Sequence, residues 1–292
     1  MLPFGLAGLI AVVLTAVGFV ASGTAAPQAT FKAGLVSDVG RFNDKGFNQN
    51  QLTGMKRAAK ILKIQYRAVE SRSAGDYLPN MASLARSGYN IVISAGFLLS
   101  DATEDVADQF PNTKFAITDQ GVEAFKRKHT NIEGLTYATQ ENSYLIGCLA
   151  AKVAARSGNK NISVVGGIKI PPVDTFLAGY KAGALKCVPG TTVQIGYSQD
   201  FIDQAKCKSI ATNQIDGGSQ VVFAVAGPCG QWPDNLGPGL VGNEHGFNAY
   251  EIRTSDSPWS ASGVRVEKAG AQHLLAATQL HFNMEDRNFS KQ

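Results

Sequence analysis

Apolar and polar positions along residues 31–62 predict a strand, a loop and a helix. Residues 31–36 form a short apolar run, residues 37–46 are rich in Asp, Asn and Gly, and apolar residues then recur at helical spacing from Phe47 to Leu62. The apolar run is typical of a strand buried on both faces of a parallel sheet. Together the three segments form the first half of a βαβ unit.

The same alternation continues to about residue 225 and predicts the fold class. Strands are expected at residues 31–37, 64–69, 90–95, 114–117, 133–139, 161–165, 192–197 and 220–225, and helices at residues 47–62, 77–87, 100–109, 140–156, 173–186 and 203–215. Alternating strands and helices favour right-handed connections, with helices on both faces of a parallel sheet. We therefore predict an α/β fold of two lobes, each built on a doubly wound parallel sheet.

After Gly227 the pattern changes. Residues 228–258 show no sustained strand or helix period, and only residues 269–280 suggest a short helix. The second lobe is therefore expected to be incomplete. We predict a signal segment at residues 1–26, a first lobe at 27–138, a partial second lobe at 139–227 and an atypical tail at 228–292.

Polar and aromatic residues follow the first strand, at the end of the strand where ligands bind in open α/β sheets. Asp38 comes just after this strand, and Phe47 and Asn48 begin the next helix. A carboxylate, an aromatic ring and a carboxamide suit a flat small molecule that carries hydrogen-bonding groups. The alternative is an ordinary turn in which Asn48 or a neighbour caps the helix.

Two further residues extend this candidate ligand site. Asp119 follows the strand at residues 114–117, so a second carboxylate is expected at the sheet edge that holds Asp38. Paired carboxylates serve acid–base catalysis or accept hydrogen bonds from a ligand. Because no nucleophile or metal-ligand cluster accompanies them, we predict binding, with no catalytic residue, metal or cofactor. Phe176, one turn into a helix of the second lobe, is a candidate ligand contact whose alternative is a core aromatic.

Composition argues against several other classes of protein. The chain is 44% hydrophobic with a net charge of +4, and its basic residues are scattered except for the triplet at residues 126–128, so a nucleic-acid surface is not indicated. No two cysteines have CxxC spacing, which argues against zinc or thiol redox chemistry. Cys148 falls in a helical apolar pattern typical of the core, and a disulfide between Cys187 and Cys207 is conceivable.

Residues 1–26 are typical of an export signal. The chain is apolar from residue 6 to residue 21 except for Thr15 and the glycines, and small residues follow up to Ala26. This predicts a signal peptide cleaved between about Gly23 and Ala26, although no Lys or Arg precedes Lys32. The alternative is an uncleaved anchor, for which the run is short. We expect an exported protein, in the periplasm or on the outer face of the plasma membrane.

Several motifs match one protein family in the family's own order. They are 38–49 (DVGRFNDKGFNQ), 77–89 (YLPNMASLARSGY), 96–102 (GFLLSDA), 111–119 (PNTKFAITD), 140–147 (QENSYLIG), 166–179 (GGIKIPPVDTFLAG) and 222–227 (VFAVAG). Together they resemble the basic membrane protein family, the substrate-binding proteins of ABC transporters, whose best understood members bind purine nucleosides. The resemblance covers residues 31–227 and stops there.

The resemblance implies a periplasmic-binding fold that closes over a purine nucleoside and presents it to an ABC permease. Ligand contacts to both lobes would stabilise the closed form. Asp38, Asn48 and Asp119 would then hydrogen-bond the ligand, and Phe47 would stack on it, with Phe176 a further contact. Two rivals remain: a sensory or regulatory relative without a transporter, and a nucleoside-acting enzyme, which would need a nucleophile or metal cluster.

The tail generates a prediction about the gene. Because the family pattern, composition and periodicity all change near Gly227, we predict a shift of reading frame near residues 228–235. The chain would then be a truncated, non-functional variant without the last strand, helices and crossovers of the second lobe. Resequencing the gene and translating its other two frames checks this. If neither frame encodes an aspartate-bearing strand and following helices, the tail is a genuine, divergent segment instead.

Overall fold

The computed structural model describes residues 31–44, 46–231, 239–243 and 252–253, which form two five-stranded sheets. The first sheet has the order β2-β1-β3-β4-β5 and is parallel throughout. Its strands are β1 (Lys32–Val36), β2 (Gln65–Val69), β3 (Ile91–Ser94), β4 (Lys114–Thr118) and β5 (Ile132–Leu135). The predicted signal segment and the helix at residues 269–280 lie outside the described residues.

The second sheet has the order β10-β9-β8-β6-β7. Its strands are β6 (Asn161–Gly166), β7 (Thr192–Tyr197), β8 (Val221–Val225), β9 (Gly239–Asn243) and β10 (Ile252–Arg253). All neighbouring pairs are parallel except β10 with β9, which is antiparallel. The predicted class, an α/β fold of doubly wound parallel sheets, is confirmed.

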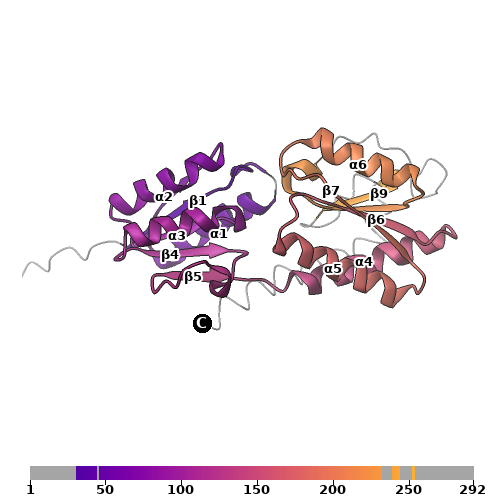
Figure 1. Cartoon of the computed structure of the whole chain (residues 1–292), viewed down its shortest axis with the longest axis horizontal. Coiled ribbons are helices and arrows are strands. Elements are labelled where there is room, and N and C mark those ends of the chain that lie inside the picture. Colours follow the sequence, from indigo (N-terminus) through magenta and orange to yellow (C-terminus); the bar gives the residue numbers. More distant parts are fainter. Residues whose placement is uncertain (1–30, 45, 232–238, 244–251, 254–292) are drawn as a thin grey trace, which may run out of the picture. The chain divides into compact units, whose positions relative to one another are not determined.

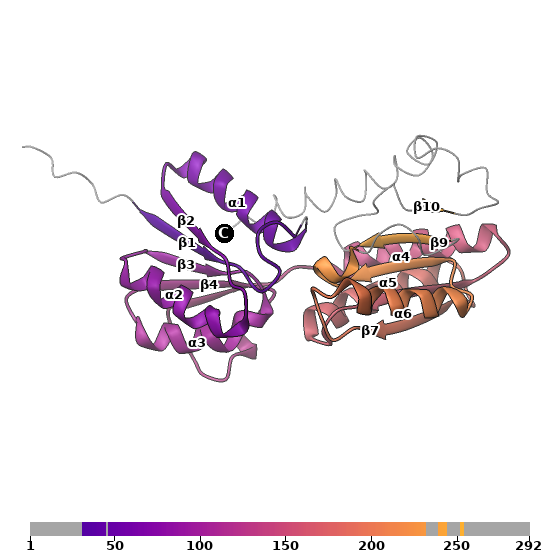
Figure 2. The same ribbon diagram turned by 90° about the horizontal axis from the view of Figure 1, so that it is seen from above.

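Helices cover both faces of each sheet, as Figure 1 and Figure 2 show. In the first sheet, α1 (Phe47–Leu62) covers one face, and α2 (Tyr77–Arg86) and α3 (Ser100–Gln109) cover the other. In the second sheet, α4 (Thr139–Arg156) and α5 (Pro171–Cys187) share a face, and α6 (Gln204–Asp216) covers the opposite one. In the described part of the chain, four 3-10 turns lie in the connections: η1 (Ala74–Asp76), η2 (Phe97–Leu99), η3 (Val122–Ala124) and η4 (Gly227–Gly230).

Helices α4 and α5 approach each other closely because glycines lie at their contact. A Cβ added to Gly179 or Gly183 of α5, or to Gly147 of α4, would overlap backbone atoms of the other helix. At Gly183 the obstructing atom is the carbonyl oxygen of Tyr144. A disulfide between Cys148 and Cys187, with Cα atoms 5.2 Å apart, joins the same two helices. The α4–α5 pair is therefore held by backbone contact and by a covalent link.

The cysteine pairing corrects two expectations. Cys148 is a disulfide partner of Cys187 and not a free core residue, and Cys207 pairs with Cys229, with Cα atoms 5.7 Å apart. The conceivable bond between Cys187 and Cys207 is therefore wrong. Pairing depends on which helices become neighbours, and spacing along the chain does not reveal that.

The tail also differs in part from the expectation. Residues 239–243 form β9, which pairs in parallel register with β8 from Val221↔Leu240 to Ala224↔Asn243. The absence of strand structure expected after Gly227 is therefore wrong for this segment. Its sequence, GLVGN, has two glycines and is too short for a recognisable period, so pairing with β8 and not local propensity forms the strand.

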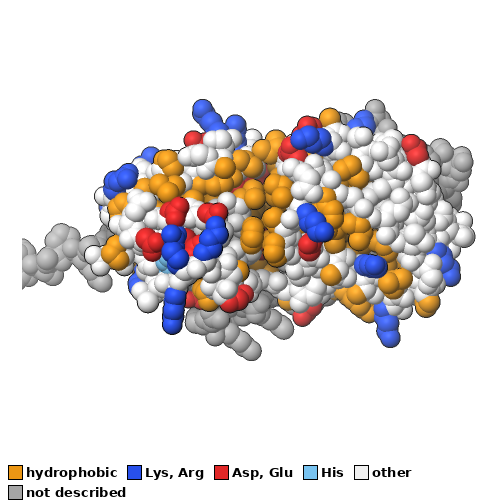
Figure 3. All heavy atoms as spheres, viewed as in Figure 1, with side chains coloured by type: hydrophobic (Ala, Val, Ile, Leu, Met, Phe, Trp, Pro, Cys, Tyr) orange, Lys and Arg blue, Asp and Glu red, His pale blue; other side chains and the backbone are white. Residues whose placement is uncertain are grey.

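The basic triplet is part of an ion-pair network on α3. The ammonium of Lys126 lies 2.8 Å from Asp101, and the guanidinium of Arg127 lies 2.8 Å from Asp105 and 3.3 Å from Asp108. On the face drawn in Figure 3, Lys and Arg side chains are dispersed, and several lie beside carboxylates. Lys126 and Arg127 of the triplet are therefore exposed side chains paired with carboxylates of α3.

The α4–α5 contact predicts opposite effects for two Gly→Ala changes. Gly183→Ala should lower the free energy of unfolding by about 1–3 kcal/mol, because the new methyl group overlaps the Tyr144 carbonyl and separates the helices. Gly54→Ala is the matched control, since Gly54 lies inside α1 with nothing within 4 Å of its added Cβ. That variant should gain up to about 1 kcal/mol from helix propensity. Urea unfolding measures both, and equal effects would contradict the close contact.

Candidate functional site

The candidate site begins two residues past β1, where Asp38 is buried with 8% of its surface exposed. Its Oδ1 accepts hydrogen bonds from the backbone N–H of Gly40 at 2.8 Å and from Nδ2 of Asn48 at 2.6 Å. Within the described part of the chain, no group donates to its Oδ2. One carboxylate oxygen is thus held by the protein and the other is left open.

Asn48, in the first turn of α1, bridges Asp38 and the loop before the helix. Its Nδ2 also donates to Oδ2 of Asp44 at 3.1 Å, and its Oδ1 accepts the backbone N–H of Asp38 at 3.3 Å. The side chain is 2% exposed. Asn48 therefore lies beside Asp38 as predicted, but its side-chain hydrogen bonds are to other residues of the protein.

Asp44 is the residue that the sequence interpretation missed. Its carboxylate accepts the backbone N–H groups of Gly46 at 3.0 Å, Asn48 at 2.8 Å and Gln49 at 3.0 Å. These are free N–H groups at the start of α1, so Asp44 acts as the helix cap. The alternative expected a turn in which Asn48 or a neighbour caps the helix. The capping side chain is that of a neighbour, Asp44, and not that of Asn48. The sequence feature that could have indicated this role is an Asp shortly before Phe47, where the helical pattern of apolar residues begins.

Phe47 lies over a glycine at the end of the neighbouring strand. Gly96 follows β3, has φ +101°, and an added Cβ would be 3.0 Å from the Phe47 ring and 3.8 Å from Oδ2 of Asp38. A side chain at Gly96 would crowd the Phe47 ring, and the positive φ disfavours any residue other than glycine. The structure therefore brings Asp38, Phe47 and Asn48 together at one sheet edge, as the sequence predicts.

Asp119 and Phe176 are placed less directly. Asp119 follows β4, is half-buried with φ +61°, and its backbone N–H donates to the Leu135 carbonyl at 2.8 Å. Since β3 separates β4 from β1, Asp119 shares the sheet edge with Asp38 but does not follow an adjacent strand. Phe176 of α5 is half-buried and packs against the core between α4, α5 and the second sheet. This position favours its alternative, a core aromatic.

Comparison with known proteins identifies the family. The family model for ABC transporter substrate-binding proteins of the PnrA-like (Bmp) type matches residues 31–233. The nucleoside-binding protein BmpA of the ABC transporter of Lactococcus lactis is 35% identical over 215 residues, 72% of this chain and 59% of that protein. Basic membrane protein A1 of Borrelia garinii is 34% identical over 221 residues, 76% of this chain and 62% of that protein.

The chain belongs to this family. A solved solute-binding protein of an ABC transporter system from Aeropyrum pernix supports the same fold, with a TM-score of 0.61 at 26% identity over 68% of this chain and 56% of that one. The chain spans about three fifths of the length of the curated relatives it matches. The family match ends at residue 233, and the reading frame beyond it stays a prediction.

In this PnrA-like chain, the carboxyl edge of the second sheet carries a further aromatic, Phe201, which the sequence did not single out and which packs against the same core as Phe176. Phe201, in the loop after β7, fills the space above Gly167, where an added Cβ would overlap its ring. Its carbonyl accepts the backbone N–H of Cys229 at 2.9 Å. The available signal was its position just beyond a strand's carboxyl end, the criterion that selected Asp38.

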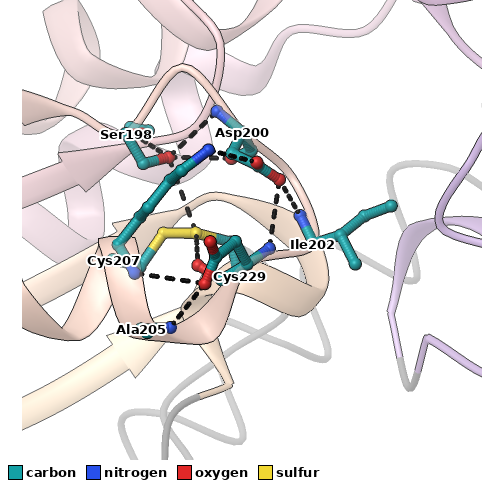
Figure 4. Close-up of a disulfide and its surroundings, with 9 residues drawn as sticks. Ser198, Asp200, Ile202, Ala205, Cys207 and Cys229 are labelled. Atoms are coloured by element: carbon teal, nitrogen blue, oxygen red, sulfur yellow. Dashed lines mark hydrogen bonds and ion pairs between the residues drawn. A yellow bond between two sulfur atoms is a disulfide. The ribbon is translucent and has the colours of Figure 1, made fainter.

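The Phe201 loop is braced by polar contacts and a disulfide, shown in Figure 4. Asp200 accepts the backbone N–H groups of Ile202 at 2.8 Å and Asp203 at 3.0 Å, and the ammonium of Lys206 at 2.8 Å. The Lys206 bond, followed by the two backbone bonds, lowers the pKa of Asp200 to about 2. The Cys207–Cys229 disulfide lies directly beneath. Phe201 is therefore presented by a fixed loop.

Burial gives Asp38 an unusual titration. Desolvation, with a smaller contribution from the charge of Asp44, raises the pKa of its carboxyl from 3.8 to about 6. The hydrogen bonds from Gly40 and Asn48 act in the opposite direction and lower this pKa. The Asp38 carboxyl ionises near pH 3.8 in the unfolded chain and near pH 6 in the folded chain. Ionisation of Asp38 therefore lowers the free energy of unfolding progressively between these two pH values, and the full loss is reached above about pH 6.

Asp38→Asn should therefore stabilise the ligand-free protein. The rise from 3.8 to about 6 corresponds to a penalty on the order of 3 kcal/mol, and Asn keeps an acceptor for Gly40 and Asn48. We expect the free energy of unfolding at pH 7.5 to rise by about 1–3 kcal/mol, with the gain vanishing near pH 4. Urea unfolding at both pH values measures this.

Asp76→Asn is the control of opposite sign. The backbone N–H groups of Arg72 and Ser73 lower the pKa of Asp76, so its ionised form stabilises the fold above its ordinary pKa. This variant should lose stability at pH 7.5 and approach the parent at low pH. A loss at pH 7.5 for Asp38→Asn as well would show that the Asp38 carboxylate is not destabilising.

Proposed function

We propose that this protein captures a purine nucleoside and presents it to an ABC permease. The observation that carries the proposal is the open Oδ2 of Asp38 beside the ring of Phe47, at the carboxyl end of β1. A carboxylate accepts hydrogen bonds from ring N–H groups or ribose hydroxyls, and an aromatic ring stacks on a base. The name of the Lactococcus lactis relative, a nucleoside-binding protein, supports the same ligand class.

In this proposal each residue has one role. Asp38 accepts a hydrogen bond from the ligand, Phe47 stacks on its base, and Asp119 is a second polar anchor at the same sheet edge. Ligand contacts to both lobes stabilise the closed form, which the permease recognises. We propose binding and not catalysis, because the family is one of substrate-binding proteins.

We further propose that the protein works outside the cytoplasm. Both disulfides join residues of the second lobe, and disulfides persist in oxidising compartments such as the periplasm. The apolar segment at residues 6–21 supports export of the chain. Among the helices of the described residues, none is long and apolar enough to cross a membrane.

Titration calorimetry of the full chain against adenosine, guanosine, inosine, uridine and ribose tests the ligand class. We expect purine nucleosides to bind, and Asp38→Ala to weaken binding by about 1–3 kcal/mol through loss of the accepting carboxylate. Asp101→Ala is the matched control, because Asp101 is an exposed carboxylate paired with Lys126 on α3. Unchanged affinity in Asp38→Ala would remove Asp38 from the site. Absence of nucleoside binding both to the parent chain and to a form with the restored reading frame would overturn the ligand class.

A further inference from the structure

The hydrogen-bond capacity of Asn48 is directed into the protein. A carboxamide has two N–H donors and one carbonyl oxygen. The two donors of Asn48 are taken by Oδ1 of Asp38 at 2.6 Å and Oδ2 of Asp44 at 3.1 Å, and its oxygen accepts the backbone N–H of Asp38. The side chain therefore has no N–H left for a ligand.

Asp44 has its acceptor sites filled in the same way. Its Oδ1 accepts the N–H groups of Gly46 and Gln49, and its Oδ2 accepts the backbone N–H and Nδ2 of Asn48. Asp44 is 4% exposed. Because its oxygens take only donors, the reversed Asn48 amide would set an oxygen against both carboxylates. Asp44 thus fixes which end of the Asn48 amide faces Asp38.

Asp38 is the member of the trio with an open position. Its Oδ1 holds two donors, while its Oδ2 receives none from the described residues. The Cβ position that Gly96 lacks is 3.8 Å from that oxygen and 3.0 Å from the Phe47 ring, so the oxygen and the ring lie close to the same backbone residue. A ligand group reaching this point meets a lone carboxylate oxygen.

We propose that Asn48 and Asp44 are positioning residues that act through Asp38, and that a ligand N–H or O–H and a solvent proton compete for the Asp38 Oδ2. This inference rests on the proposed function and narrows it: the ligand must offer a donor beside a flat ring. It also reassigns Asn48, which then orients the acceptor without touching the ligand.

The charges around Asp38 make the competition measurable near neutral pH. The ionisable groups that act on it within the described residues are Asp44 and Tyr77, and neither is a cation. Burial raises the pKa of Tyr77 to about 12, so its phenol is neutral when Asp38 titrates near 6. Since the Asn48 bond lowers the pKa of Asp38, Asn48→Ala should raise it further.

Carbon-13 NMR titration of the Asp38 carboxyl in the ligand-free full chain tests the positioning role directly. We expect a midpoint of about 6 in the parent chain and a higher midpoint in Asn48→Ala. Asn48→Ser is the second variant if the Ala protein does not fold. Gln51→Ala, also on α1, is the control and should leave the midpoint unchanged. An unchanged midpoint in the Asn48 variants would overturn the proposal, whatever the ligand is.

Calorimetry with adenosine at pH 6.0 and 8.5 tests the competition. In the parent chain, binding should release protons near pH 6, seen as a dependence of the measured heat on buffer ionisation. Asn48→Ala should lose at least about tenfold in affinity at pH 6.0 and stay within about threefold of the parent at pH 8.5, where Asp38 is ionised in both. An equal loss at both pH values, or no proton release by the parent chain, would overturn it. If adenosine does not bind the parent chain at all, the proposed ligand fails, and the NMR titration still decides the positioning role.

Discussion

The hydrogen bond from Asn48 to Asp38 couples the first strand, the loop and the first helix of this protein. Asp38 lies two residues past β1, Asn48 belongs to α1, and Asp44 in the intervening loop caps that helix and bonds the Asn48 amide. A polar group buried this deeply destabilises a fold unless it is bonded. Here both oxygens of Asp44 and the amide of Asn48 are bonded, and Asp38 has one bonded oxygen. The position of the open Asp38 oxygen therefore depends on helix capping, strand register and loop length together.

In the proposed function, this arrangement sets stability against binding at Asp38. Burial disfavours the ionised Asp38 carboxylate, yet a ligand donor is recognised best by an ionised oxygen shielded from water. A fold selected for stability alone would place an amide or an apolar side chain there. The second sheet has the opposite character: the Phe201 loop is fixed by a disulfide, a capped helix and an ion pair that favours the charged form of Asp200.

Much of the fold follows from the sequence because strands buried on both faces are apolar runs and the helices carry a clear period. The same reasoning places Asp38 and Phe47 together, since it needs only the rule that ligands bind at the carboxyl ends of parallel strands. That rule does not identify Asp44, because the role of Asp44 depends on the free N–H groups at the start of a helix. The sequence also does not reveal the pairing of Cys148 with Cys187, because this disulfide depends on the close approach of α4 and α5 at their glycines. For Phe176 the sequence leaves two interpretations open, because helical spacing suits a core residue as well as a ligand contact, and its packing favours the core residue.

The edge of β8 that faces away from β6 in the second sheet sets one structural requirement for the residues that follow the family match. All five residues of β8 are buried, so its backbone N–H and C=O groups have little access to water on either edge. On one edge they pair with β6, and on the other with β9, through four residue pairs from Val221 to Ala224. An unpaired edge beside a fully buried strand would leave polar groups without partners and expose a template for association with other chains. Whichever reading frame encodes the continuation, it must therefore supply a parallel strand at this edge, and residues 239–243 occupy that position in this chain.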